Sequence, residues 1–345
     1  MSLPLYSARW HGCRADEFLW RGHRLIVLEN ELLRIGVLAS KGADIVEFRY
    51  KPRDLDLMWH APQPVLPPGR FVPSSPRPQG SFLDFYPGGW QEVFPSAGPA
   101  TEYKGAALGQ HGEVSLQPWD VRVIEDLPGR IEVEFAVETM RTPFRLERRM
   151  ALESGSGILR IRERVTNLGE EPMHYAWGHH PALGAPFVEA GCLLELPDCE
   201  VRQTAYAEGL NRRFAAESQG RFPHLPKIDG SQGRVDQIPG SDARSEDVLQ
   251  FHGFSEGRCV LRNPRQGLAF LLRWPADVFP HLWCWQVCGG SFGYPYYGRA
   301  YTVAVEPFNC PIEGLAQSAA AGVVPELAPG STTEAWLEAE IEARA

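Results

Sequence analysis

The segment GRIEVEFAVETMRTPFRLERRMALESGSGILRIRERVTN (residues 129–167) decides the fold class of this chain. Apolar and polar residues alternate in three runs, which turn-forming residues separate at 141–143 and 153–157. Successive side chains of a β-strand point to opposite faces, so this alternation predicts three strands with one buried face each. Because the turns between them are short, the strands are expected to pair as an antiparallel meander.

The same pattern extends toward both ends of the chain. Residues 25–50 alternate similarly, and residues 259–274 read as two strands about a turn at 263–267. The 34 glycines and 30 prolines are spread over the whole length and interrupt short runs rather than long helical ones. The run TTEAWLEAEIEA (332–343) has helix-favouring composition, but it follows a turn-like segment, and we predict a strand. The fold class is therefore predicted as all-β.

Two segments depart from this rhythm: 61–80, which is crowded with prolines, and 205–246, which is polar and rich in Gly, Arg and Ser. Both are predicted to be long loops. Candidate site residues lie on both sides of the second segment, so residues 1–345 are expected to form a single domain.

Composition narrows the classes of function. The chain has 345 residues, of which 43% are hydrophobic and 22% charged, and its formal net charge is −9. No Lys/Arg-rich run stands out, which disfavours nucleic acid and anionic membranes as partners. No apolar stretch approaches the length of a membrane span. Seven cysteines without a CxxC pair indicate neither a disulfide framework nor a zinc ribbon, and with an N-terminus lacking an apolar signal core they favour the cytoplasm.

The two faces of a strand carry alternate residues, and this alternation (parity) indicates which titratable residues could be catalytic. In YTVAVEPF (301–308), Glu306 shares a face with small residues, while Val303 and Val305 fall on the opposite, core face. In MHYAWGHHP (173–181), the adjacent histidines face opposite ways, and we expect His180 on the open face and His179 toward the core. In LGQHGEVSLQPW (108–119), read as a strand, His111 falls on a polar face.

Several segments resemble the galactose mutarotase (aldose 1-epimerase) family, and the likeness covers nearly the whole chain. It rests, in the order expected of that family, on GADIVEFRY with a following DLMW, GGWQEVFPSAG, HGEVSLQPW, HHPALGAPF and VEPFNCPIEGL. The resemblance implies a large antiparallel β-sandwich that binds a sugar. It also implies that His180 is the acid that protonates the ring oxygen, Glu306 the base that takes the anomeric hydroxyl proton, and His111 a supporting hydrogen-bond donor.

Other residues are candidates for binding the sugar. Trp90 and Trp285 offer flat apolar faces and indole N–H donors, although core packing is an equal alternative for such large aromatic side chains. Gln91 and Gln286 could bind hydroxyls, and Asp247 is the nearest counterpart of the aspartate with which galactose mutarotases hold sugar hydroxyls. Tyr86-Pro87 stands where the hexose-6-phosphate branch of the family would carry an arginine, which disfavours phosphate recognition.

The expected function is a mutarotase that acts on an unphosphorylated aldose. Opening a hemiacetal requires one base and one acid and no metal or redox cofactor, and Glu and His have suitable chemistry near neutral pH. Two alternatives stay open: an epimerase of a modified sugar, and a sugar-binding or sensing protein without catalysis. The oligomeric state and the identity of the sugar are left open by the sequence.

Overall fold

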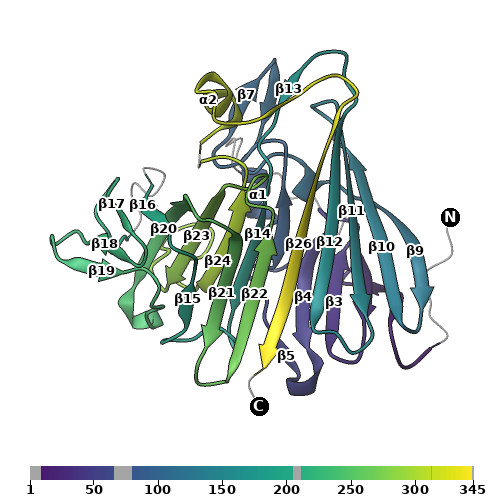
Figure 1. The fold of residues 1–345 in the computed structure, drawn as a ribbon, viewed down its shortest axis with the longest axis horizontal. Helices are drawn as coiled ribbons and strands as arrows, with labels where there is room; N and C mark the ends of the chain where they lie inside the picture. The colour runs from purple at the N-terminus through teal and green to yellow at the C-terminus, as the bar shows by residue number, and fades with distance from the viewer. Residues whose placement is uncertain (1–8, 66–79, 205–210, 312, 344–345) are drawn as a thin grey trace.

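The computed structural model describes residues 9–65, 80–204, 211–311 and 313–343, and within them the chain is almost entirely β-structure. Two large antiparallel sheets pack face to face, with the eight-stranded sheet in front of the twelve-stranded one in Figure 1. The predicted all-β antiparallel sandwich is therefore confirmed.

The twelve-stranded sheet carries the candidate site. Its strands follow the order β1-β2-β3-β4-β6-β14-β24-β23-β20-β16-β17, and β5 pairs with β4. Their bounds are β1 Arg14–Trp20, β2 His23–Glu29, β3 Leu33–Leu38, β4 Asp44–Tyr50, β5 Leu55–Asp56, β6 Trp90–Val93, β14 Gly178–Gly184, β16 Glu200–Gln203, β17 Gln219–Arg221, β20 Ser245–His252, β23 His281–Cys288 and β24 Tyr301–Phe308.

The eight-stranded sheet contains the meander predicted from residues 129–167. Its order is β15-β21-β22-β26-β12-β11-β10-β9, so the consecutive strands β9 to β12 lie side by side. The run at 332–343 is a strand, β26, and it pairs with β12 and β22, which confirms that prediction. The bounds are β9 Asp120–Leu127, β10 Arg130–Glu138, β11 Phe144–Glu153, β12 Ile158–Asn167, β15 Leu193–Glu195, β21 Gly257–Asn263, β22 Leu268–Trp274 and β26 Thr332–Ala343.

Shorter strand pairs, helices and turns lie outside the two large sheets. Three two-stranded pairs are described, β7–β8 (Thr101–Tyr103, Ala106–Leu108), β13–β25 (Met173–His174, Glu326–Leu327) and β18–β19 (His224–Pro226, Gln232–Arg234). The helices are α1 (Gly80–Asp84) and α2 (Leu315–Ala320), with 3-10 turns at Lys51–Arg53, Val114–Leu116 and Ser241–Ala243. In the described part of the chain, no helix combines the length and the apolar character that crossing a membrane requires.

The two segments predicted as long loops are only partly described. Residues 66–79 and 205–210 lie outside the described residues. Within 211–246, however, β17, β18 and β19 form, and β17 extends the large sheet at its edge (Figure 1). The prediction of a loop is wrong for this part, because short strands with Gly and charged residues give little alternation from which to recognise them.

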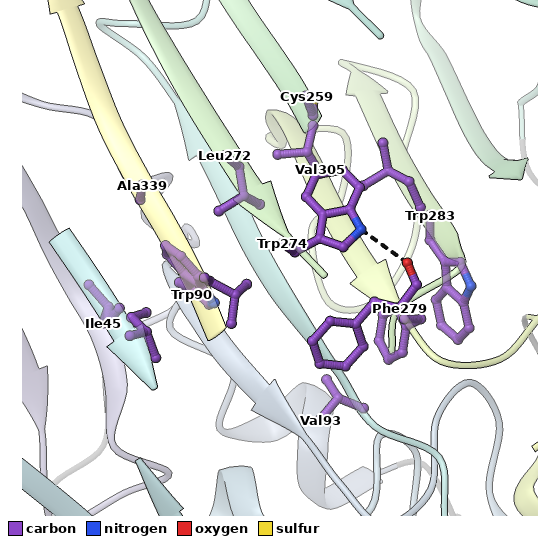
Figure 2. Packing of buried hydrophobic residues seen from close by; sticks show 14 of the residues in the cluster. Ile45, Trp90, Val93, Cys259, Leu272, Trp274, Phe279, Trp283, Val305 and Ala339 are labelled. Atoms are coloured by element: carbon purple, nitrogen blue, oxygen red, sulfur yellow. Dashed lines mark hydrogen bonds between the residues drawn. The ribbon is translucent and has the colours of Figure 1, made fainter. Parts of the chain in front are cut away.

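The main core lies between the two sheets. Figure 2 shows Ile45, Trp90 and Val305 from the large sheet packed toward Leu272 and Ala339 from the smaller one. In β11 the alternate residues from Phe144 to Met150 are buried, including the charged Arg148, whereas those between them are more exposed. The outer face of the large sheet carries a second, separate cluster of buried residues, and this cluster surrounds the candidate site.

Candidate functional site

His180 and Glu306 face each other across two neighbouring strands. Strands β14 and β24 pair antiparallel, with Gly178 opposite Phe308 and Ala182 opposite Ala304, so that His180 and Glu306 occupy facing positions between these pairs. The distance from Nε2 of His180 to Oε1 of Glu306 is 3.4 Å. The sequence placed the two residues on one face by parity alone, and the register agrees.

The local sequence explains why these side chains point outward. On β24, Val303 and Val305 are buried in the core between the sheets, and Leu183 on β14 joins them. On the opposite face, Ala182 and Ala304 are small residues of the outer cluster. Alternation therefore anchors both strands through aliphatic side chains and leaves the two titratable groups on the face with small neighbours.

Burial shifts the proton affinities of the pair in opposite directions. Both side chains are almost inaccessible, with 7% of His180 and 4% of Glu306 exposed. Desolvation lowers the pKa of His180 to about 4 and raises the pKa of Glu306 well above its usual value, because burial disfavours the charged form of each group. The pair therefore favours the neutral arrangement, in which Glu306 carries a proton and His180 does not.

His111 is the third titratable group at this site, but it does not lie on a strand. It belongs to a turn, with a backbone φ of 60°, and a 3-10 turn follows at Val114–Leu116. The prediction of a strand over 108–119 is therefore wrong. The turn nevertheless brings the His111 ring to 5.7 Å from the His180 ring, measured between centroids.

The His111 imidazole is buried and incompletely bonded. Its Nδ1 has no hydrogen-bond partner in the structure. Desolvation and the neighbouring His180 lower the pKa of His111 to about 3, so the ring is neutral at physiological pH. A buried polar atom without a partner costs free energy, and a ligand oxygen is one group that could satisfy it.

An aromatic cover lies over the three residues. We use this name for Trp59, Phe82, Tyr86, Trp285 and Tyr296, whose rings contact one another and the histidines. The Tyr86 hydroxyl lies 3.3 Å from Nδ1 of His180, and Phe82 packs edge-on against His111 at 4.5 Å between centroids. Of these five residues, the sequence had suggested only Trp285, because the others lie outside the named strands, where strand parity has no meaning.

Trp285 and a neighbouring carboxylate define one side of the site. The Trp285 ring lies 5.9 Å from the His180 ring, and its indole N–H donates to Oε1 of Glu246 at 2.9 Å. Glu246 was missed by sequence reasoning. Burial raises its pKa, and bonds from Trp285 and Ser291 partly offset this shift. On β20, Glu246 is opposite Val287, which belongs to the outer cluster, so its side chain shares the face of His180.

Asp247 and Gln286 do not belong to the site. They are opposite each other in the β20–β23 pair, and Gln286 is opposite Val303, whose side chain points into the core. Arg213 donates to both side chains, and the Gln286 amide donates to the carbonyl of Val235 at 2.9 Å. The structure therefore does not bring these two predicted sugar-binding residues to the site, because both groups hold the 211–235 segment against the inner face of the sheet.

Of the pair Trp90 and Gln91, only Gln91 is on the side of the site. Gln91 is opposite His180 in the β6–β14 pair, its amide donates to the carbonyl of Gly88 at 2.6 Å, and its Oε1 has no hydrogen-bond partner in the structure. Trp90 points the other way, into the core shown in Figure 2, and its indole N–H donates to Nδ1 of His179 at 3.2 Å. Of the two roles that the sequence left open for Trp90, the structure places its side chain in the core-packing one.

A buried polar network lies beneath the site, on the inner face of the same strands. It comprises His179, Glu92, Glu163 and Arg148: Nε2 of His179 is 2.9 Å from Glu163, and Arg148 is 3.4 Å from Glu92. Glu92, Glu163 and His179 are close enough together to hold a metal ion. However, the indole of Trp90 bonds to Nδ1 of His179, the indole of Trp177 donates to Glu92, and a guanidinium already supplies positive charge. These contacts favour a hydrogen-bonded network over a metal site.

The network and the site predict how stability depends on pH. Burial and the neighbouring Glu163 raise the pKa of Glu92 to about 8, and burial raises that of Glu163 to about 7. A raised carboxyl pKa means that the folded state holds protons that the unfolded state has lost, so stability falls as pH rises toward 8. The lowered pKa values of His111, His179 and His180 act oppositely, but only below about pH 6.5.

The melting temperature should therefore decrease between pH 6.5 and pH 8, where these histidines no longer titrate. Glu163→Gln keeps an acceptor for His179 and removes one of the two carboxyl groups, so its melting temperature should change much less over that interval. Differential scanning calorimetry of both proteins measures the difference. Parallel curves for the two proteins would contradict the assignment.

The comparisons with known proteins agree with the architecture. Residues 20–341 match a family model described as a domain of unknown function, DUF4432. No curated protein matches the sequence. Among solved structures, a Klebsiella pneumoniae protein provisionally named an aldose 1-epimerase is 14% identical with a TM-score of 0.74, and the match covers 97% of this chain and 85% of that one.

Two further structures have similar coverage. The Slr1438 protein of Synechocystis is 18% identical, with a TM-score of 0.63 and coverage of 99% of this chain and 100% of that one. A galactose mutarotase related enzyme of Lactobacillus acidophilus is 18% identical, with a TM-score of 0.61 and coverage of 92% and 97%. The structural similarity shows a shared fold, but at identities this low the activity has to be argued from the site. The chain belongs to the DUF4432 family, and its fold is that of the galactose mutarotase-like proteins.

Proposed function

We propose that this protein is a cytoplasmic carbohydrate mutarotase of the aldose 1-epimerase type, which interconverts the anomers of an unphosphorylated sugar. The main support is the 3.4 Å approach of the His180 imidazole to the Glu306 carboxylate, beside an incompletely bonded His111. An acid and a base held together on one face are what ring opening of a hemiacetal requires. The names of the structures that share this fold support the same class of reaction.

The pair can carry out the reaction without a net change in its protons. His180, as the imidazolium, donates the Nε2 proton to the ring oxygen while the C1–O5 bond breaks and its electrons go to that oxygen. Glu306, as the carboxylate, takes the anomeric hydroxyl proton, and the released electron pair forms the C1 carbonyl. Afterwards His180 is neutral and Glu306 is protonated, which is the arrangement that burial favours. Rotation about C1–C2 and the reverse transfers close the ring.

The surrounding groups support sugar binding. The Trp285 ring offers a flat apolar surface, and Glu246 offers an acceptor for hydroxyl groups next to it. Gln91 and His111 each present an atom without a hydrogen-bond partner in the structure. Within the described residues, neither Glu306 nor Glu246 forms an ion pair with a lysine or an arginine, and two such carboxyl groups disfavour a phosphorylated substrate.

The site draws on distant parts of the chain. His111 and His180 precede the 205–246 segment. Glu246 is its last residue, and Glu306 follows it. Because one sheet unites strands from both sides of that segment, we propose that residues 1–345 act as one domain.

The test is NMR exchange spectroscopy between anomers over a panel of free aldoses and their 6-phosphates. We expect faster exchange for at least one unphosphorylated aldose and none for its phosphate. Uncatalysed rates over the whole panel would contradict the proposal. If no sugar exchanged faster but a free sugar raised the melting temperature, the protein would be a sugar-binding protein without catalysis, because a ligand that binds only the folded state stabilises it. A new diastereomer in the spectra would indicate an epimerase.

We infer that substrate entry requires the aromatic cover to separate, because only 7% of the His180 side chain and 4% of the Glu306 side chain are exposed. The Tyr294 hydroxyl contacts the Asp84 carboxylate, which joins the 289–300 segment to α1. Tyr294→Phe removes this contact, which we expect to be worth about 0.5–1.5 kcal/mol, so kcat/KM for the preferred sugar should rise roughly twofold to tenfold. Tyr297→Phe, a change on the same segment at an exposed residue, is the control. Steady-state kinetics decide, and a Tyr294→Phe protein with unchanged or lower kcat/KM would show that this contact does not limit entry.

A further inference from the structure

The Tyr86 hydroxyl is positioned to control the protonation of His180. It lies 3.3 Å from Nδ1, while the other ring nitrogen, Nε2, faces Glu306 at 3.4 Å. The two nitrogens thus have separate partners on separate elements, Tyr86 from the segment between α1 and β6, and Glu306 from β24. Measured over the whole residue, His180 is 5% exposed and Tyr86 is 2% exposed, so water cannot freely replace either partner.

The chemistry of the proposed function specifies which nitrogen must exchange its proton. Nε2 faces Glu306, and it has to carry a proton before ring opening and release it during that step. A neutral imidazole keeps one proton, so Nδ1 must hold that proton whenever Nε2 is free. If the neutral ring instead held its proton on Nε2, donation would leave an imidazolate anion, which is inaccessible near neutral pH.

We propose that Tyr86 is a positioning residue that accepts a hydrogen bond from Nδ1–H of His180 and thereby keeps Nε2 as the proton-exchanging nitrogen. The inference rests on the proposed function for its catalytic consequence, but the tautomer can be measured independently of any activity. The second ring nitrogen of a working histidine is commonly held in this way by an oxygen acceptor.

The surroundings of Tyr86 suit the role of a neutral acceptor. Its ring stacks on Phe82, with centroids 5.2 Å apart, and contacts Trp59 at 5.9 Å, which fixes its orientation within the aromatic cover. Burial, reinforced by the nearby Tyr296, Glu306 and Asp44, raises the pKa of Tyr86, so the hydroxyl stays un-ionised. The titratable groups that contact His180 itself are Tyr86, Glu306 and His111. None of them other than Tyr86 lies within hydrogen-bond distance of Nδ1 in the described structure.

The test combines Tyr86→Phe, which removes the hydroxyl and keeps the ring, with a matched control. Tyr103→Phe is that control, because the Tyr103 hydroxyl contacts Nδ1 of His174 at 3.1 Å in a similar pair away from the site. The first readout is the ¹⁵N spectrum of histidine-labelled protein, with the His180 signals assigned by their loss in His180→Gln. Wild type and Tyr103→Phe should show the proton of neutral His180 on Nδ1, and Tyr86→Phe should shift it toward Nε2.

The second readout is anomer exchange. Tyr86→Phe should lower kcat by about 10-fold to 100-fold, part of the usual contribution of a positioned general acid, with KM changed less than threefold. A wild-type His180 protonated on Nε2, or a Tyr86→Phe protein with unaltered tautomer and kcat, would overturn the inference. If the wild-type protein accelerates exchange of no sugar while the tautomer still depends on Tyr86, the proposed function fails and the role of Tyr86 in setting the tautomer stands.

Discussion

Glu306→Gln should reduce the acceleration of anomer exchange by at least about 10²-fold, within the range of about 10²–10⁴ that a positioned general base contributes. The amide cannot take the anomeric hydroxyl proton, yet it matches the carboxylate in size and can still contact Nε2 of His180. Because burial raises the pKa of Glu306, the neutral amide should also be tolerated by the fold. Exchange spectroscopy measures the rate, and the melting temperature reports on the fold.

Glu246→Gln is the matched comparison for this variant. Glu246 is a buried carboxyl group on the same face, but its hydrogen-bond partner is the indole of Trp285 and not the His180 ring. We expect its loss to raise KM by about tenfold, the size of one charge-assisted hydrogen bond, with kcat changed little. If Glu306→Gln retained exchange within twofold of wild type, or if both variants altered KM alone, Glu306 would not be the base.

The sequence predicted the pair His180 and Glu306 because, in the strands that carry them, residues of different size or type alternate between the two faces. In β24, Val303 and Val305 mark the buried face, which leaves Glu306 on the other. In β14 the same reasoning separates His180 from His179, and their different partners, Tyr86 and Glu163, agree with it.

Parity failed in β20 and β6, where adjacent residues did not differ enough in type to mark one face as the core. In β20 the residues from Ser245 to Phe251 are all buried, and Glu246 and Asp247 are adjacent carboxylates, so the pattern could not indicate which one faces the site. The same applies to Trp90 and Gln91 in the fully buried β6. Both faces of these two strands carry polar residues, so the residue types did not show which face is the inner one, and only the pairing register distinguishes the two faces.

The contacts made by irregular segments were beyond sequence reasoning for a different reason. His111 reaches the site through a turn with positive φ, and Phe82 and Tyr86 reach it from α1 and the segment after it. The alternation of a strand does not apply to turns or to a five-residue helix, so no pattern could place these rings over the histidines. The aromatic cover, and with it the partner of Nδ1 of His180, required the structure.

The buried network beneath the site should contribute strongly to stability. Arg148 of β11 reaches from the smaller sheet to Glu92 of β6 in the larger one, and its guanidinium also contacts the carbonyl of Ala43. It lies over the rings of Trp119 and Phe135, at 5.1 and 5.7 Å from their centroids. Its side chain is fully buried, so water could not compensate the carboxyl groups if the guanidinium were absent.

Arg148→Met should therefore lower the free energy of unfolding by about 3–5 kcal/mol, the usual cost of leaving one partner of a buried ion pair uncompensated. Arg164→Met is the control, because Arg164 pairs with Glu334 on the exposed face of the same sheet and should cost about 1 kcal/mol or less. Adding Glu92→Gln to Arg148→Met should recover part of the loss, since it removes the carboxyl group that Arg148 contacted. Urea denaturation at pH 9, above the pKa of about 8 of Glu92, compares the three variants with the wild-type protein. If Arg148→Met cost no more than Arg164→Met, the network would be a passive part of the core, and Glu92 would not need the guanidinium.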